Sequence, residues 1–300
     1  MSTAPLEEEV DPLVGLRWAG STAPTVDSLG GLVRLATVPA HPRRQFGHVP
    51  RWVRKAAVPP LILGLWALAS SRGWIDERSF PPPGDVVTQA REMLASGELQ
   101  EHLTVSLGRV VRGLAIGVPI GLVLAVVSGL FRLGEDLVDV PMQMLRAMPI
   151  LALTPFIILW FGIGETPKIA YVAIGSVFPI YLNTFAAIRG VDAQLVEAGR
   201  VFGLGRLGLV RHVILPGAAA GFLLGLRYAL AIAWLVLIVA ETINATSGLG
   251  YLMNQARSFY QTDVLVVGLV VYALLGLLSD VLVRILERSA LSWRRSFTGA

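Results

Sequence analysis

Six polar residues stand inside or beside strongly apolar segments, and their chemistry suits the binding of an anion. Arginine supplies positive charge and directed hydrogen-bond donors, and amides and hydroxyls supply neutral donors. The six residues are Gln143, Arg146, Asn183, Glu241, Thr242 and Asn244. They include neither a nucleophile–base pair nor two carboxylates, so they do not predict an enzyme active site.

The sequence also excludes several kinds of cofactor chemistry. It contains no cysteine, and its four histidines are scattered, so disulfides, thiolates and a metal site are not expected. A P-loop needs Gly-Lys followed by Ser or Thr, whereas Lys55 precedes Ala56 and Lys168 precedes Ile169. We therefore expect no cofactor in this chain, and any ATP must be hydrolysed by another subunit.

The segments around these residues are those of a membrane protein. Hydrophobic residues make up 54% of the 300 residues and charged residues only 15%, which is far more apolar than a typical soluble domain. Several runs approach the roughly 20 residues that cross a bilayer. We predict an all-α transmembrane domain over residues 51–290. Its six spans are expected near residues 53–74, 104–128, 140–161, 169–188, 218–241 and 264–286.

The distribution of basic residues predicts the orientation. They cluster before the first span, in the loop 189–216 and after the last span. An even number of spans places these groups on one side, which the positive-inside rule assigns to the cytoplasm. We thus expect residues 1–50 to be a disordered cytoplasmic tail and 291–300 a second cytoplasmic tail of a cell-membrane protein. The net charge of +4 then reflects orientation and not binding to nucleic acid.

In this topology the six polar residues become candidates for lining a translocation pathway. Ionisable side chains in a span are costly in lipid and normally face a cavity, a partner or an interface. Arg146 could instead snorkel to the cytoplasmic surface, and Glu241 could serve in structural pairing. For Arg109, Arg112 and Arg227, near the ends of their spans, we prefer snorkelling.

Glycine and proline predict how the spans pack. Small residues at four-residue intervals let helix backbones approach closely in lipid, so two glycine stripes indicate packing and not chemistry. They are Gly113, Gly117 and Gly121 in the second span, and Gly217, Gly221 and Gly225 in the fifth. The third span is interrupted by Pro141, Pro149 and Pro155. The sequence PPPGD at 81–85 predicts the start of a short interfacial helix before the second span.

The loop 189–216 is basic, broken by glycine and placed between two apolar spans. Asp192 is a candidate N-cap for a short helix whose apolar face includes Leu195 and Phe202. Gly203 and Gly205 should end that helix, and a second amphipathic stretch follows up to Val213. Pro216 is expected to start the next span. The product would be a compact helical knob suited to a groove on another protein.

This loop resembles the EAA motif of ABC-importer permeases. The motif is Glu-Ala-Ala, three residues, Gly, nine residues, Ile, one residue and Leu-Pro, and every spacing is kept. The matching residues are Glu197, Ala198, Gly199, Gly203, Val213, Leu215 and Pro216, with Gly199 in place of Ala and Val213 in place of Ile. Longer segments, among them 143–165, 178–192 and 237–264, are similar to aliphatic-sulfonate permeases, which are grouped with taurine and nitrate permeases.

The resemblance covers nearly everything from residue 60 onward and implies a type I importer fold with a cytoplasmic coupling helix. It implies a homodimer of this subunit in the lipid bilayer, two cytoplasmic ATPase subunits that bind ATP and Mg²⁺, and an extracytoplasmic binding protein. The implied cargo is an aliphatic sulfonate, with taurine, nitrate or another small anion as the alternative.

Two other function classes fit the residues less well. An ion-coupled secondary transporter more often carries acidic or histidine residues at mid-membrane, and these spans lack an obvious proton relay. A membrane-embedded enzyme would need paired carboxylates, a nucleophile–base pair or a metal cluster, and the sequence pattern supports none of them.

Overall fold

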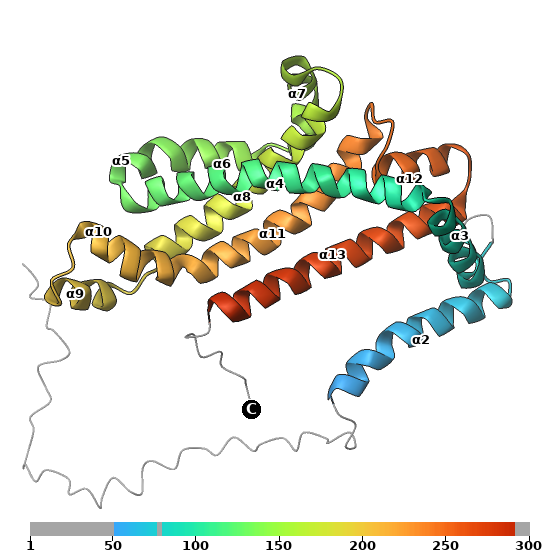
Figure 1. Ribbon diagram of the computed structural model, residues 1–300, viewed down its shortest axis with the longest axis horizontal. Coiled ribbons are helices and arrows are strands. Elements are labelled where there is room, and N and C mark those ends of the chain that lie inside the picture. Colours follow the sequence, from blue (N-terminus) through green and yellow to red (C-terminus); the bar gives the residue numbers. More distant parts are fainter. Residues whose placement is uncertain (1–50, 77–79, 292–300) are drawn as a thin grey trace, which may run out of the picture. The chain divides into compact units, whose positions relative to one another are not determined.

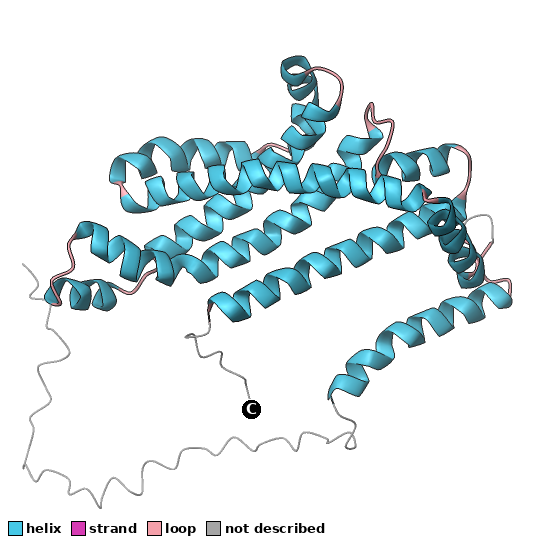
Figure 2. Ribbon diagram, in the orientation of Figure 1, coloured by secondary structure: helices cyan, strands magenta, loops and turns pink. Residues whose placement is uncertain are grey.

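The computed structural model describes residues 51–76 and 80–291, and every regular element in these ranges is a helix (Figures 1 and 2). The predicted N-terminal tail, residues 1–50, lies outside the described residues, as does the predicted C-terminal tail apart from Leu291. From Pro59 onward the chain belongs to one compact unit, to which the following description applies.

The helices follow one another with short connections. The α-helices are α2 (Arg51–Ser71), α3 (Pro83–Ser96), α4 (Glu98–Leu130), α5 (Arg132–Gly134), α6 (Val140–Ala147), α7 (Thr154–Phe161), α8 (Glu165–Arg189), α9 (Ala193–Val201), α10 (Arg206–Leu209), α11 (Leu215–Thr242), α12 (Leu249–Ser258) and α13 (Thr262–Ala290). Two π-helical turns, Glu135–Asp139 and Val210–Ile214, and one 3-10 turn, Ile150–Leu153, lie between them. The PPPGD signal is confirmed as the start of α3, with proline in its first turn.

Four helical segments of the described residues are long and apolar enough to cross a membrane: Glu98–Leu130, Glu165–Arg189, Arg206–Thr242 and Thr262–Ala290. A fifth candidate is the pair Arg132–Ala147 and Ile150–Phe161, which is bent by 95°, and the apolar stretch Ala57–Ser71 of α2 is shorter. The structure thus supports four or five spans by length and composition, where six were predicted.

The bend shows that the predicted third span, 140–161, is not one straight helix. Met148 has extended backbone angles and ends α6, and Pro149 follows it. Proline disfavours the helical conformation of the residue before it, which explains the break at this position. Pro141 and Pro155 instead lie in the first turns of α6 and α7, where proline is tolerated.

Helix α8 packs against both α4 and α11, and the two glycine stripes make these contacts close. A Cβ atom at Gly113 would lie 2.5 Å from the side chain of Val172, and one at Gly121 would lie 2.7 Å from the carbonyl of Val177. On the other side of α8, Gly225 approaches the carbonyl of Pro179 in the same way, at 2.8 Å. The prediction of close packing is confirmed for both stripes.

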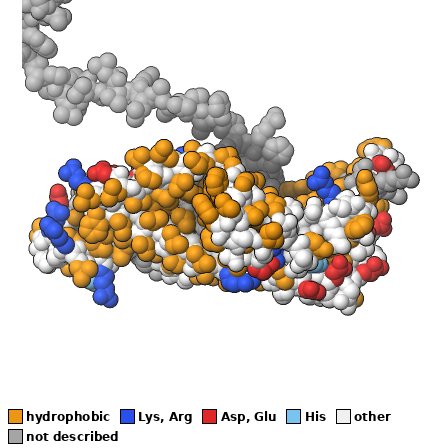
Figure 3. All heavy atoms as spheres, turned by 90° about the horizontal axis from the view of Figure 1, so that it is seen from above, with side chains coloured by type: hydrophobic (Ala, Val, Ile, Leu, Met, Phe, Trp, Pro, Cys, Tyr) orange, Lys and Arg blue, Asp and Glu red, His pale blue; other side chains and the backbone are white. Residues whose placement is uncertain are grey.

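Many hydrophobic side chains lie on the surface and not in the interior, as the face drawn in Figure 3 shows. The exposed faces of α2, α4 and α13 carry many leucines, valines and isoleucines, for example Leu61, Val123 and Leu278. Such faces are suited to contact with lipid tails, because both are apolar. The helices satisfy their own backbone hydrogen bonds, which lipid cannot do.

Candidate functional site

The loop between α8 and α11, residues 190–214, forms a two-part knob that we call the coupling loop. The side chain of Asp192 accepts a hydrogen bond from the amide of Gln194 at 2.9 Å, so Asp192 caps α9 as predicted. Gly203 has a left-handed φ of 82°. There the amides of Gly203 and Leu204 donate to the carbonyls of Arg200 and Gly199, which ends α9 in the usual way.

The second half of the coupling loop differs from the prediction. Helix α10, the π turn Val210–Ile214 and α11 follow without interruption, so the helical run reaches from Arg206 to Thr242. Pro216 lies in the first turn of α11, as predicted, but no break separates α11 from the π turn before it. Proline has no backbone N–H, so Pro216 cannot donate the hydrogen bond that continues a regular α-helix. The π turn lies directly before α11, in which Pro216 is the second residue.

Gly199 is the buried centre of the coupling loop. A Cβ atom at this position would lie 2.7 Å from Leu209, with Leu204 and Val213 also within contact distance. The Gly199 position, where the motif has alanine, is therefore where α9 approaches the following helical stretch most closely.

The outer surface of the coupling loop is apolar and exposed. The side chains of Phe202 and Leu207 are 87% and 81% exposed, and Val201 and Leu195 are exposed beside them. Glu197 and Ala198 are exposed on the same helix. Large exposed apolar side chains next to charged ones are typical of a surface that contacts another protein.

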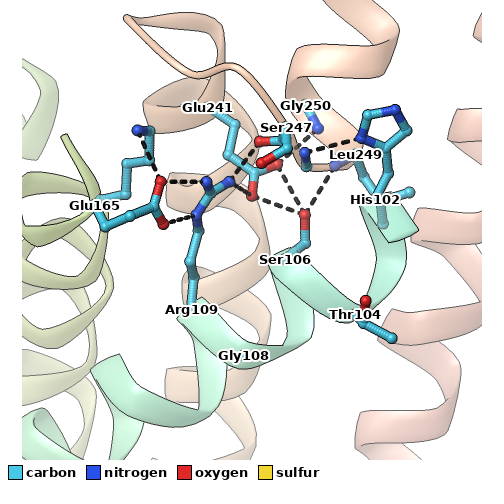
Figure 4. A network of polar contacts seen from close by, with 12 residues as sticks. His102, Thr104, Ser106, Gly108, Arg109, Glu165, Glu241, Ser247, Leu249 and Gly250 are labelled. Atoms are coloured by element: carbon cyan, nitrogen blue, oxygen red, sulfur yellow. Dashed lines mark hydrogen bonds and ion pairs between the residues drawn. The ribbon is translucent and has the colours of Figure 1, made fainter. Parts of the chain in front are cut away.

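A second site, which is polar, lies at the ends of α8 and α11 that are far from the coupling loop. It is centred on Arg109 of α4 (Figure 4). The Arg109 side chain is 0% exposed. Its Nε and Nη2 donate to the two carboxylate oxygens of Glu165 at 2.7 and 2.6 Å. Its Nη1 donates to Glu241 Oε1 and to the carbonyl of Ser247, both at 2.7 Å. The expectation that Arg109 snorkels is wrong.

Glu241 is equally buried and holds the start of α12. It accepts hydrogen bonds from Arg109, from the Ser106 hydroxyl at 2.7 Å and from the amide of Gly250 at 2.7 Å. The Ser106 hydroxyl in turn accepts from the amide of Leu249. Of the two uses considered for Glu241, the geometry favours structural pairing.

Two further groups complete the network. Lys168 is 3% exposed and donates to the carbonyls of Gly164 at 2.8 Å and Asn244 at 3.3 Å, and it lies 3.4 Å from Glu165. His102 Nδ1 accepts from the amide of Gly248 at 3.1 Å. The network therefore contains two cations and two carboxylates, and its buried charges are paired, as charges in apolar surroundings normally are.

The backbone around the network is shaped for it. Gly248 has φ of 116°, and a Cβ atom there would lie 2.5 Å from both Arg109 Nη1 and the carboxyl carbon of Glu241. Asn244 has φ of 53°, which is uncommon for a residue with a side chain. The segment 243–248, which we call the outer loop, is therefore folded tightly onto the charged cluster.

The remaining pathway candidates do not meet at one place. Gln143 donates to Asp139 at 3.0 Å, and the same carboxylate accepts from the Tyr181 hydroxyl of α8. Asn183 and Thr242 donate to carbonyls of their own helices. Arg146 is exposed on α6 and forms no ion pair within the described part of the chain. Asn244 is brought to the network through its carbonyl.

Arg227 also forms ion pairs: its guanidinium lies 3.2 Å from Asp280 and 2.9 Å from Glu287 of α13, and its side chain is 32% exposed. Sequence reasoning missed Arg109, Glu165 and Lys168 as a group because Arg109 lies more than fifty positions from the other two. The available signal was the same for each: a charged side chain at the edge of an apolar span. Among the described residues no group of histidine and acidic side chains could hold a metal ion.

Comparison with known proteins gives concordant matches. A family model described as "Binding-protein-dependent transport system inner membrane component" matches residues 117–292. A putative aliphatic sulfonates transport permease protein of Escherichia coli (strain K12) is 50% identical over 252 residues, covering 83% of this chain and 96% of that protein. A protein of the same description from Bacillus subtilis (strain 168) is 40% identical, covering 86% and 92%.

Among solved structures, the chain is similar in fold to one in a crystal structure of an amino acid ABC transporter with histidines. The TM-score is 0.54 at 20% sequence identity, and the match covers 68% of this chain and 96% of that chain.

Proposed function

This chain belongs to the family of inner membrane components of binding-protein-dependent transport systems and is a permease subunit of an ABC importer, and we propose that its cargo is an aliphatic sulfonate. The similarity to aliphatic sulfonate permeases, 50% and 40% identical over most of the chain, is the observation that carries this proposal. Taurine, nitrate or another small anion is the alternative cargo.

The proposed assembly has two copies of this subunit, two cytoplasmic ATPase subunits and an extracytoplasmic binding protein. Each permease copy would contribute six spans, with the apolar part of α2 as the first and the bent α6–α7 pair as the third. Both termini and the coupling loop would face the cytoplasm, which the basic residues there support. The ATPase subunits, not this chain, would bind ATP and Mg²⁺.

The coupling loop is the proposed contact with the ATPase. Its exposed apolar residues, Phe202 and Leu207 among them, would enter a groove, as amphipathic helices commonly do. The motif residues Glu197, Ala198, Gly199, Gly203, Val213, Leu215 and Pro216 shape this surface. Helix α8 ends directly before the loop and α11 begins directly after it. A movement of the ATPase would therefore displace both helices as a rigid body.

The proposed translocation pathway uses the exposed polar residues of α6 first. Arg146 supplies a positive charge, and Gln143 lies one turn earlier on the same helix. The side-chain amides of Asn183 and Asn244 would add hydrogen-bond donors. The Thr242 hydroxyl already donates to its own helix, and the buried carboxylate of Glu241 is occupied by Arg109 and Ser106. A sulfonate group needs this combination of charge and donors.

The test is transport by the complete complex in proteoliposomes with its own ATPase and binding protein. Ethanesulfonate, taurine and nitrate are supplied separately, and ATP hydrolysis and uptake are measured. The proposal expects ethanesulfonate to stimulate both most strongly. Preferential stimulation by taurine or nitrate would replace the cargo, and uptake without the ATPase would exclude the importer mechanism.

A paired substitution tests the docking surface in the same preparation. Glu197→Ala on α9 should reduce ATPase association and stimulated hydrolysis. Glu92→Ala, an exposed glutamate on α3, is the matched control and should change neither. Equal behaviour of the two variants would contradict the assignment of the coupling loop.

A further inference from the structure

The buried network and the coupling loop lie at opposite ends of the same two helices. Helix α8 begins at Glu165 and ends at Arg189, directly before the coupling loop. Helix α11 begins at Leu215, directly after that loop, and ends at Thr242, one residue beyond Glu241. One side chain from a third helix, Arg109 of α4, therefore holds the far ends of both helices that bracket the coupling loop.

Helices α8 and α11 are packed closely enough to move as one body. Gly221 and Gly225 of α11 lie against the backbone of α8, where Cβ atoms would lie 2.7 Å from the carbonyl of Asn183 and 2.8 Å from that of Pro179. Close-packed interfaces of this kind transmit displacement and do not absorb it by gradual deformation.

Arg109 also fastens the outer loop to these helices. It binds the carbonyl of Ser247 directly, and its partner Glu241 binds the amide of Gly250. Ser106 and His102, from the same face of α4, bind the amides of Leu249 and Gly248. The start of α12 thus follows any change in the positions of Arg109 and Glu241.

Several residues around the network have unusual backbone angles. Gly162 and Gly164, between α7 and α8, and Gly248 have positive φ values, as does Asn244. A small pocket adjoins these segments and is lined by Gly162, Gly164, Lys168, Tyr171 and Asn244. The buried Tyr171 hydroxyl has no hydrogen-bond partner among the described residues. Hinge movements are commonly absorbed at a few loop or helix-end residues, and these segments supply such positions.

We propose that Arg109 is a positioning residue for transport, which makes the outer loop and the 162–164 turn move together with α8, α11 and the coupling loop. The inference rests on the proposed function, because it assigns the ATPase contact to the coupling loop. Arg109 does not act as a cargo ligand, since its Nε, Nη1 and Nη2 all donate within the network.

The first test uses Glu165, which is 51% exposed. Glu165→Gln keeps a hydrogen-bonding side chain beside Arg109 but leaves two cations facing one carboxylate, so its thermal midpoint is measured together with its activity. The complete complex is reconstituted with ATPase and binding protein, and ethanesulfonate is the probe. In Glu165→Gln we expect ATPase stimulation by the loaded binding protein, and uptake, to fall about tenfold, a usual size for coupling between distant sites. Basal ATPase activity should be retained, because it belongs to the partner subunit.

The matched control is Glu287→Gln. Glu287 is 45% exposed and pairs with an arginine at 2.9 Å, but it links α11 to α13 and not to α4 or α8. This variant should keep wild-type stimulation. Equal stimulation of Glu165→Gln and wild type would overturn the inference, as would equal losses in the two variants.

A second test separates positioning from stability. Arg109→Gln leaves two carboxylates without their cation and is expected to be unstable, whereas Arg109→Gln combined with Glu241→Gln removes a buried charge of each sign and should regain stability. A positioning role predicts that stimulation stays low in the double variant although its thermal midpoint recovers. Recovery of stimulation together with the midpoint would leave Arg109 a structural role only and reject the inference.

The response of the wild-type complex shows whether the proposed function or only the role of Arg109 has failed. If ethanesulfonate, taurine and nitrate all fail to stimulate the wild-type complex, the proposed function fails and the inference falls with it. If wild type responds and Glu165→Gln responds equally, only the role of Arg109 fails.

Discussion

The two ends of the α8–α11 pair are held together by different physics. At the coupling loop, order comes from short-range devices: the Asp192 cap, the left-handed Gly203 and the contact of Gly199 with Leu209. At the other end, order comes from Arg109, which joins residues more than fifty positions apart in the chain. The first end leaves apolar side chains exposed, and the second buries Arg109, Lys168 and Glu241.

This difference suits two tasks. A surface that docks onto another protein must remain exposed and keep its shape locally, without help from distant residues. A connection between helices must instead exclude water, because hydrogen bonds between charges are strongest in a dry environment. Substitutions at the two ends should therefore fail differently, in stability at the network and in assembly at the coupling loop.

The largest expected effect is that of Arg109→Met. It leaves the buried Glu241 and its neighbour Glu165 without their shared cation, and loss of one partner from a buried pair costs about 3–5 kcal/mol. We expect the variant to accumulate poorly in membranes and to unfold at a much lower temperature, measured by thermal unfolding in detergent. Wild-type stability would show that the network is not the dry, charge-held site described.

Gly248→Ala should have the next largest effect. Alanine would be strained at φ of 116°, and its Cβ would meet Arg109 and Glu241 at 2.5 Å. A residue forced into such backbone angles costs about 1–3 kcal/mol, and the contact adds to that. Gly276→Ala is the control, since nothing lies within 4 Å of a Cβ at that glycine of α13. Equal midpoints of the two variants in the same assay would contradict the prediction.

Asp192→Ala should destabilise only the coupling loop. Loss of an N-cap side chain costs about 1 kcal/mol, and here the cost falls on the short helix α9. We expect hydrogen exchange to accelerate at residues 193–201 while α8 and α11 stay protected. Faster exchange throughout α8 would mean that the two ends are not independent in stability.

Phe202→Ser should have the smallest effect on stability. Its side chain is 87% exposed, so the thermal midpoint should stay near that of wild type. Binding of the ATPase to the permease should nevertheless weaken, measured by co-purification and by stimulated ATP hydrolysis. Unchanged binding would remove Phe202 from the proposed docking surface and weaken the contrast between the two ends.

Local patterns predicted one end of the molecule well. The cap at Asp192 and the glycine stop at Gly203 appear in the structure as expected, because each depends on neighbours a few residues away. The glycine stripes also pack as expected, although their partners lie on another helix. The prolines predicted an interruption of the third span, but they did not predict that its two halves would meet at 95°. The angle depends on how α6 and α7 pack, which proline alone does not specify.

The sequence by itself determined the membrane class, the family, the N-cap of α9 at Asp192 and the glycine stop at Gly203. The composition and the spacing of residues within short motifs are sufficient for these conclusions. Only the tertiary structure decided that the Arg109 side chain is buried among other helices. Its partners Glu165 and Glu241 come from other helices, and the free energy of a charge in an apolar span depends on whether such partners reach it.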